Sequence, residues 1–204
     1  MTTAESVEPR RPGRPRSAQL DARIVEAALE ELARNGVEGF SVEAVATAAG
    51  VGKTTIYRRW RSKDELIVHA VATLDDEMPA PGWGPDARAE LVMLIDMIRR
   101  RAIHGRTGSI LWCVVGSAER HPDLMRQYKD VVVEPRRDRV RAAIRRGIDE
   151  GLIRADVDIE LALQLLTGPM LARTVMRALE EVKRVPEEFA QQVVDGVLDG
   201  LRPR

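Results

Sequence analysis

The chain contains 204 residues, of which 44% are hydrophobic and 31% are charged, and its 32 basic and 32 acidic side chains leave no formal net charge. This composition is typical of a soluble globular protein and argues against a disordered chain, and the length allows a small domain beside a larger one. Zero net charge argues against a protein that coats nucleic acid or membranes through bulk attraction.

Basic residues nevertheless gather in the N-terminal third of the chain. They form two local runs, Arg10, Arg11, Arg14 and Arg16 in the first and Lys53, Arg58, Arg59, Arg61 and Lys63 in the second. Acidic residues are spread through the rest. We therefore expect any contact with nucleic acid to lie in the N-terminal third.

The single cysteine, Cys113, excludes an intramolecular disulfide and a cysteine-based metal cluster within one chain. The first residues, MTTAESVEPRRPGRPR, lack the apolar core of a signal peptide. No stretch approaches the roughly 20 apolar residues that are needed to span a bilayer. We expect a cytoplasmic protein without a membrane partner.

The chain is expected to begin with a flexible arm, because residues 1–16 are polar, rich in Pro and Arg and without periodic apolar positions. The first helix follows, with an apolar face that includes Ile24 and Leu32. Asn35-Gly36 supplies its stop signal.

Capping signals define the next helices. Ser41 is a good N-cap for a short helix that ends at Gly50, and a further helix begins near Gly52. Ser62 and Glu65 have the spacing of a capping box, which predicts the start of a fourth helix. Three short helices thus precede a longer one.

Residues 78–85 are the clearest break in the chain, because prolines at that density prevent a continuous helix. Beyond them, residues 110–115 are apolar almost all round and predict a buried helix. The last helix should carry Pro186 in its first turn. Its apolar stripe consists of Phe189, Val193, Val197 and Leu201. No strand pattern of useful length is present, so the sequence predicts an all-α fold.

Residues 158–182 are apolar on two sides, and each apolar side of such a helix must pack against another protein surface. One broad face holds Ile159, Ala162, Leu163, Leu166, Met170 and Leu171, and the other holds Leu161 and Leu165. We expect the last two long helices to form a four-helix interface across the two-fold axis of a homodimer. The residues expected at this interface are Leu166, Met170, Phe189, Val193 and Val197.

Residues 41–60 meet the requirements of a helix-turn-helix. Ala46 is a small residue where two helices cross closely, Gly50 tolerates a positive φ in the turn, and Val51 and Ile56 are inward anchors. The exposed face of the second helix carries Lys53, Thr54, Thr55, Tyr57 and Arg58. Such a helix can enter a major groove with its N-terminal residues nearest the base edges.

The run from Ile24 through Leu66 resembles the DNA-binding domain of the tetracycline-repressor (TetR) family. The pattern that carries the resemblance is Ala46-x-x-Ala49-Gly50-Val51-x-x-x-x-Ile56-Tyr57-x-x-Trp60-x-x-Lys63-x-x-Leu66. Trp60 stands where the family usually has phenylalanine. The resemblance implies an all-helical homodimer whose two DNA-binding domains read a palindromic operator in double-stranded DNA.

The resemblance also implies roles for individual residues. Lys53, Thr54 and Thr55 would approach bases, whereas Tyr57, Arg58, Arg59 and Lys63 would hold the phosphate backbone, and Ser41 joins the DNA-binding set. Tyr57 also fits a second interpretation, in which its ring belongs mostly to the core. The domains implied are the basic arm at 1–16, the helix-turn-helix domain at 17–63 and a ligand-binding and dimerisation domain at 64–204.

The arm contains Gly-Arg-Pro-Arg, which ends at Arg16 and resembles the core of an AT-hook. Arg14 and Arg16 in an extended segment fit a narrow A·T minor groove, where the negative potential is enhanced. The alternative is a solvated tail, and the sequence leaves both open.

An enzyme is not indicated. Residues 50–55 imitate a phosphate-binding loop and make an ATPase a distant alternative, but Thr47 stands where the pattern needs glycine and no strand precedes the loop. His69, His104 and His121 lack metal spacing, no catalytic set is nominated and no cofactor is implied. Cys113 fits a small core residue better than a sensor.

The second domain is expected to hold a ligand pocket for a small hydrophobic or amphipathic molecule instead of a phosphorylated metabolite. The residues expected to line it are Met93, Met97, Leu111, Trp112 and Met170, although each methionine also fits ordinary core. The sequence thus predicts a repressor that a ligand releases from DNA. A dimeric DNA-binding regulator without a small-molecule ligand is the alternative.

Overall fold

The computed structural model describes residues 15–75, 82–103, 105–180 and 185–202. Within these ranges every regular element is helical, which confirms the all-α fold. The elements are α1 (Pro15–Gly39), α2 (Val42–Ala49), α3 (Lys53–Tyr57), α4 (Lys63–Ala72), the 3₁₀ turn η1 (Thr73–Asp75), α5 (Ala87–Ile103), α6 (Gly105–Gly116), α7 (Pro122–Tyr128), the π-helical segment η2 (Lys129–Val133), α8 (Glu134–Asp149), α9 (Ile159–Glu180) and α10 (Glu188–Leu201). None of the described helices is long and apolar enough to cross a bilayer.

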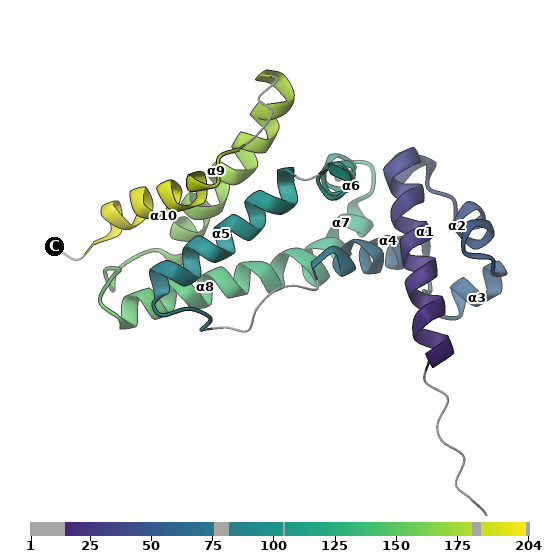
Figure 1. Ribbon diagram of the computed structural model, residues 1–204, viewed down its shortest axis with the longest axis horizontal. Coiled ribbons are helices and arrows are strands. Elements are labelled where there is room, and N and C mark those ends of the chain that lie inside the picture. The colour runs from purple at the N-terminus through teal and green to yellow at the C-terminus, as the bar shows by residue number, and fades with distance from the viewer. Residues whose placement is uncertain (1–14, 76–81, 104, 181–184, 203–204) are drawn as a thin grey trace, which may run out of the picture.

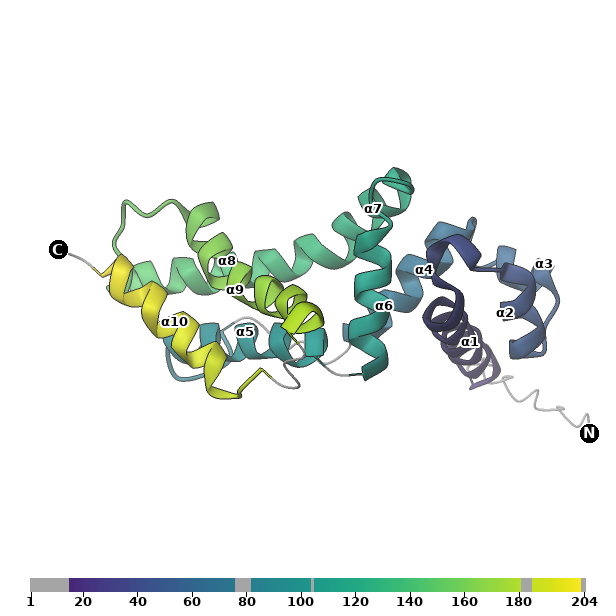
Figure 2. The same ribbon diagram turned by 90° about the horizontal axis from the view of Figure 1, so that it is seen from above.

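The molecule is elongated, as Figures 1 and 2 show, with α1, α2 and α3 at one end and α5, α8, α9 and α10 towards the other. The described residues form two hydrophobic cores. The first joins the buried faces of α1 to α4 with Ile110 and Val114 of α6 and Leu124 of α7, and the second joins α5, α8, α9 and α10. The first core therefore continues past residue 63, where the sequence placed a domain boundary, through α4 into α6 and α7.

The helical backbone of α1 breaks at Gly36, within its expected stop signal. Gly36 has φ 67° and ψ −175°, a region that is essentially restricted to glycine, and a further turn continues to Gly39. A Cβ at position 36 would lie 3.2 Å from Sγ of Cys113 in α6. Glycine here permits both the change of direction and the close approach of α1 to α6.

The helix α6 is less buried than its apolar sequence predicts. Ile110 and Val114 are fully buried, but Trp112 and Cys113 are only half-buried, and Val115 is 41% exposed. The helix packs against the first core through Ile110 and Val114, and none of its described residues belongs to the second core, so part of its surface remains open. The prediction of a buried helix is therefore wrong for Val115.

The two apolar sides of α9 are present, with one side in the second core and the other at the surface. The buried residues are Ala162, Leu163, Leu166 and Met170, and the exposed ones are Leu161, Leu165 and Leu171. Leu171 was expected on the buried side and is instead 53% exposed.

The buried stripe of α10 differs from the predicted one except at Leu201, which is buried as predicted. Its other buried members are Ala190, Val194 and Leu198, each one position after a predicted residue. Phe189, Val193 and Val197 are half-buried at its margin. Pro186 precedes the helix, which begins at Glu188, so it does not occupy the first turn as expected.

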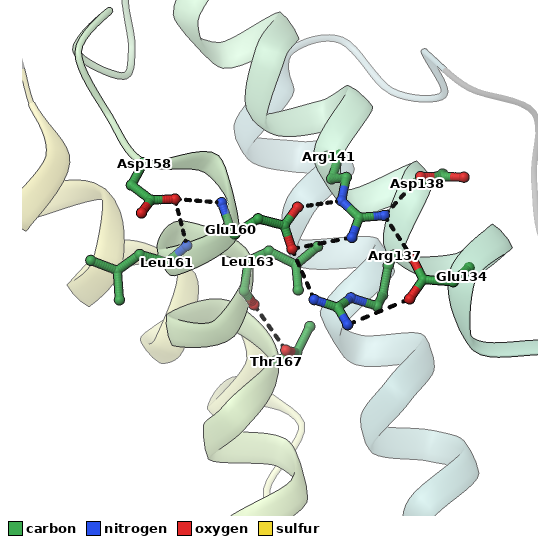
Figure 3. A network of polar contacts seen from close by, with 9 residues as sticks. All are labelled: Glu134, Arg137, Asp138, Arg141, Asp158, Glu160, Leu161, Leu163 and Thr167. Carbon is green, nitrogen blue, oxygen red and sulfur yellow. Dashed lines mark hydrogen bonds and ion pairs between the residues drawn. The ribbon is translucent and has the colours of Figure 1, made fainter. Parts of the chain in front are cut away.

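An ion-pair network connects α8 to the start of α9 (Figure 3). Nε of Arg141 donates to Oε1 of Glu160 at 2.5 Å, and the same guanidinium pairs with Glu134 and Asp138. Arg137 reaches the Glu160 carboxylate at 2.9 Å. The hydrogen bond from Arg141 lowers the pKa of Glu160, and the hydrogen bond to Glu160 raises the pKa of Arg141. The network fixes the first turn of α9 against α8.

Two glycines with positive φ should respond differently to asparagine. Gly50 has φ 65° and ψ 41°, the left-handed conformation that asparagine tolerates, whereas the conformation of Gly36 is one that side chains avoid. We predict that Gly36→Asn lowers the free energy of unfolding by about 1–3 kcal/mol, and that Gly50→Asn lowers it by less. Urea denaturation at equal protein concentration measures both; equal losses would contradict the assignment.

Candidate nucleic-acid interface

The turn between α2 and α3 is built by its caps. Oγ of Ser41 accepts a hydrogen bond from the N–H of Ala44 at 3.2 Å and caps α2 at its start. At its end, the N–H of Gly50 donates to the carbonyl of Thr47 and the N–H of Val51 donates to the carbonyl of Ala46, at 3.1 and 2.9 Å. These bonds satisfy the last carbonyls of α2 and set the direction in which α3 leaves.

Buried apolar residues then hold α3 in place. Ala46, 5% exposed, and Ile56, 1% exposed, lie in the core shared by α1, α2 and α4. Trp60 follows α3 and is also buried, with its ring 5.5 Å from the ring of His69 in α4. Because these anchors face inward, the opposite side of α3 faces solvent.

The solvent side of α3 carries most of the residues expected to contact DNA. Lys53, Thr54, Tyr57 and Arg58 are exposed, and Thr55 is half-buried. Tyr57 is 49% exposed, so its ring does not belong mostly to the core. Four of the five residues lie on α3 and Arg58 directly follows it. Figure 1 shows α3 at one end of the molecule.

Arg59 is placed differently from its neighbour Arg58. Its Nε forms an ion pair with Asp21 of α1, and its NH1 donates to the carbonyl of Thr55 at 3.2 Å. Only 19% of its side chain is exposed. Arg59 thus connects α3 to α1, a contact between residues 38 positions apart that helical periodicity cannot reveal.

Lys63 is also held within the protein. Its Nζ donates to the carbonyl of Val37 at 2.8 Å and lies 5.9 Å from the centre of the Phe40 ring. Next to it, Oγ of Ser62 accepts from the N–H of Glu65 at 3.0 Å, which is the first half of the expected capping box. Glu65 itself accepts from the N–H of Arg61 instead of that of Ser62.

Sequence reasoning missed three residues that touch this site. Asp21 holds Arg59, Glu43 of α2 forms an ion pair with Lys53, and Arg23 of α1 donates to the carbonyl of Ala49. All three are charged residues on helix faces, and the sequence alone does not distinguish them from solvated side chains. No local signal distinguishes them, because their partners lie on other helices.

The expected basic arm cannot be compared in full with the structure. Residues 1–14, including Arg14, lie outside the described residues. Helix α1 begins at Pro15, so the backbone of Arg16 is helical and not extended as an AT-hook would require.

The residues predicted to bind a ligand fall at four places. Leu111 and Trp112 line a cavity of about 130 Å³ together with Ile98, Val115 and Leu171, and with polar groups from α5, α7 and α8. Met93 lines a separate groove between α5 and α10, and Met170 is buried in the second core. Met97 is half-buried on α5. The structure thus unites two of the five.

The residues predicted at a dimer interface are also divided. Leu166 and Met170 are 1% and 2% exposed and pack within their own chain, which leaves them almost no surface for a partner. Phe189, Val193 and Val197 retain partial exposure on α10.

The structure does not support the interpretation of residues 50–55 as the phosphate-binding loop of an ATPase. Residues 50–55 form the turn after α2 and most of α3, so a short helix precedes them where an ATPase needs a strand. Among the described residues, no group of three or more His, Cys, Asp or Glu side chains is arranged to hold a metal ion.

In this site a short helix faces solvent, and a tight turn connects it to a second helix that it crosses. This arrangement is that of a helix-turn-helix DNA-binding protein. A family model described as bacterial regulatory proteins of the tetR family matches residues 24–70. A second, described as the tetracyclin repressor-like C-terminal domain, matches residues 84–197. The chain belongs to the TetR family of DNA-binding transcriptional regulators, a family of regulators and not of enzymes.

Relatives support this assignment over nearly the whole chain. The DNA-binding transcriptional repressor TetR of Mycobacteroides abscessus is 29% identical over 187 residues, which cover 90% of this chain and 94% of that protein. The uncharacterized HTH-type regulator YdeS of Bacillus subtilis is 26% identical over 191 residues, or 93% of each chain.

Solved structures show the same fold. MexZ, a repressor responsible for antibiotic resistance in Pseudomonas aeruginosa, matches with a TM-score of 0.71 and 21% identity, and the match covers 92% of this chain and 96% of that one. FadR from Bacillus subtilis, solved with stearoyl-CoA, matches with a TM-score of 0.66 and 16% identity over 89% of this chain and 99% of FadR.

Proposed function

We propose that this chain is a transcriptional repressor that binds a palindromic operator as a homodimer and that a small, mainly hydrophobic ligand releases it from DNA. The observation that carries the proposal is the position of α6. This helix lines the cavity with Leu111 and Trp112, and it packs on α1 near Gly36. A ligand with unequal affinity for two positions of α6 would shift the population between them and move the DNA-binding helices.

In this proposal residues 17–63 read DNA, and residues 64–204 bind the ligand and dimerise. Lys53, Thr54 and Thr55 approach base edges from the N-terminal end of α3. Tyr57 and Arg58 contact phosphates. The exposure of α3 supports these roles, because a recognition helix contacts base edges with its N-terminal residues.

Arg59 and Lys63 have a different role in the proposal. Both were expected at the phosphate backbone, but their donor groups already have partners in Asp21 and Val37. We assign them to positioning: Arg59 sets the angle of α3 on α1, and Lys63 fastens the start of α4 to the end of α1.

Helices α9 and α10 carry features that a single chain does not explain. A Cβ added at Gly168, Gly196 or Gly200 would meet no atom within 4 Å. Glycine inside a helix costs about 1 kcal/mol relative to alanine, so a glycine beside open space is unfavourable in the isolated chain. A second chain that packs closely against α9 and α10 accounts for these glycines.

Exposed leucines extend the same argument. Leu161 and Leu165 are 52% and 45% exposed and lie one turn apart on α9. On a helical wheel Gly168 falls on the same side. We therefore propose that the dimer interface contains Leu161 and Leu165 in place of Leu166 and Met170, with Val193 and Val197 contributed by α10.

The cavity supports a regulated repressor. Its wall is mainly apolar and it lies among α5, α6, α7, α8 and α9. A neighbour of the same fold, FadR, was solved with stearoyl-CoA, which shows that this fold can hold an amphipathic ligand. The alternative, a DNA-binding regulator without a small-molecule ligand, assigns no function to the cavity.

Arg58 and Arg59 form a matched pair for testing the DNA-binding surface. Arg58→Gln should weaken binding to all sequences and reduce the slope of log affinity against log salt by about one per subunit contact. Arg59→Gln should lower thermal stability and leave that slope unchanged, because Asp21 already neutralises this guanidinium. Fluorescence anisotropy with operator DNA, selected from genomic fragments, measures both. Equal changes in slope would refute the division of roles, and selected sites without two-fold symmetry would refute the palindrome.

Leu165→Asp should dissociate the proposed dimer. Each protomer would lose the burial of one leucine and would instead bury one carboxylate, so two carboxylates would lose water at the interface. The dimer dissociation constant should therefore rise about 100-fold or more. Gln164→Asp, an exposed neighbour on α9, is the control. Analytical ultracentrifugation measures both variants. If Leu165→Asp sediments as a dimer with the wild-type affinity, the interface lies elsewhere.

A further inference from the structure

The cavity beside α6 contains a charged region that the proposed hydrophobic ligand does not use. Two guanidinium groups belong to its lining, Arg101 from α5 and Arg136 from α8, and the phenol of Tyr128 lies with them. None of the described residues that line the cavity is acidic. An apolar chamber with two cationic groups in its wall is matched to a molecule of the opposite charge.

Burial keeps these polar groups in the protonation states that favour an anionic ligand. It lowers the pKa of Arg136 to about 10, and Arg136 therefore remains protonated at neutral pH. Burial also raises the pKa of Tyr128, which is 4% exposed, against the opposing charge of Arg101, so the phenol keeps its proton and can donate a hydrogen bond. An anion in the cavity can hydrogen-bond to a partly buried guanidinium at close range, where solvent screens the attraction less than at the surface.

The size of the cavity limits the apolar part of the ligand. Its volume is about 130 Å³, close to an engineered apolar cavity of about 150 Å³ that holds benzene. Trp112 and Leu111 of α6 form part of the apolar wall. The space inside the cavity therefore fits one ring or a short hydrocarbon chain.

We propose that the ligand is a small amphipathic carboxylic acid, bound as its anion, whose carboxylate is held by Arg101 and Arg136 and whose ring or short chain contacts Leu111 and Trp112. This inference rests on the proposed ligand-controlled function and names the ligand class for the same site. Arginine suits the role because its planar fork pairs with both oxygens of a carboxylate. Tyr128 supplies a further donor.

The position of α6 gives the anion a mechanical role. Arg101 precedes α6 in the chain and Arg136 follows it, whereas the apolar wall includes α6 itself. The carboxylate of the ligand would draw the C-terminal end of α5 and the N-terminal end of α8 together, and the ring of the ligand would press on Trp112. These two contacts would displace α6. On its other side, α6 meets Gly36 through Cys113, and Arg120 at its C-terminal end pairs with Glu38.

The test uses matched probes and matched variants of the full chain. Phenylacetate and hexanoate are compared with phenylacetamide and hexanamide, which have the same shape without the charge. Isothermal titration calorimetry should show that each carboxylate binds about 10-fold or more tightly than its amide. Arg136→Met should weaken carboxylate binding by about the same factor and leave amide binding unchanged.

Two controls keep the result interpretable. Arg145→Met removes an exposed arginine from the same helix and should change neither affinity. Methionine is similar in length to arginine and carries no charge, and thermal unfolding of each variant without ligand checks that it folds. If Arg136→Met does not fold, Arg136→Lys takes its place. Lysine keeps the charge but lacks the planar guanidinium that donates two parallel hydrogen bonds, so this variant should weaken carboxylate binding several-fold.

The proposal is overturned if the amides bind as tightly as the carboxylates, if folded Arg136→Met binds carboxylates like the wild type, or if the wild type binds none of these acids at millimolar concentration. Operator binding by the unliganded wild type is measured separately. A protein that binds its operator but no carboxylate loses only this inference, whereas a protein without operator selectivity loses the proposed function as well.

Discussion

The core that α1 to α4 share with α6 and α7 is the constraint on which the rest of the structure depends. Ile56 and Trp60, which position the recognition helix, belong to the same buried cluster as Ile110 and Val114 of α6. Because a densely packed core cannot be deformed locally without cost, a displacement of α6 must be accommodated by the helices that face DNA. Helices α6 and α7 are therefore packed into the same core as the helix-turn-helix, across the boundary that the sequence placed at residue 63.

Local signals made the DNA-binding end predictable from the sequence. Ser41 and Ser62 cap helices through bonds to residues three positions away, and Gly50 adopts the positive φ that a helix end requires. These interactions operate within a few residues, so a pattern of residue types records them. The sequence did not reveal the internal partners of Arg59 and Lys63, because these partners, 38 and 26 positions away, are chosen by the packing of helices and not by spacing.

The second region was harder to predict for a related reason. Helical periodicity identified α9 as apolar on two sides, but it could not decide that Leu166 faces the core while Leu171 remains exposed. A wide apolar stripe allows several rotations of a helix, and the neighbours that select one are distant in sequence. The same limit applies to the cavity, which unites Leu111 and Trp112 with arginines of α5 and α8 that no sequence pattern associates with them.

The internal partners of the basic residues have a kinetic consequence. Lys53 pairs with the carboxylate of Glu43, and Arg59 pairs with that of Asp21. Attachment to unrelated DNA is driven by cations that displace condensed counterions, and cations that a carboxylate already neutralises displace fewer. The protein should therefore dwell only briefly on each stretch of chromosome that lacks its site. Its search would then proceed by frequent release and recapture more than by long sliding.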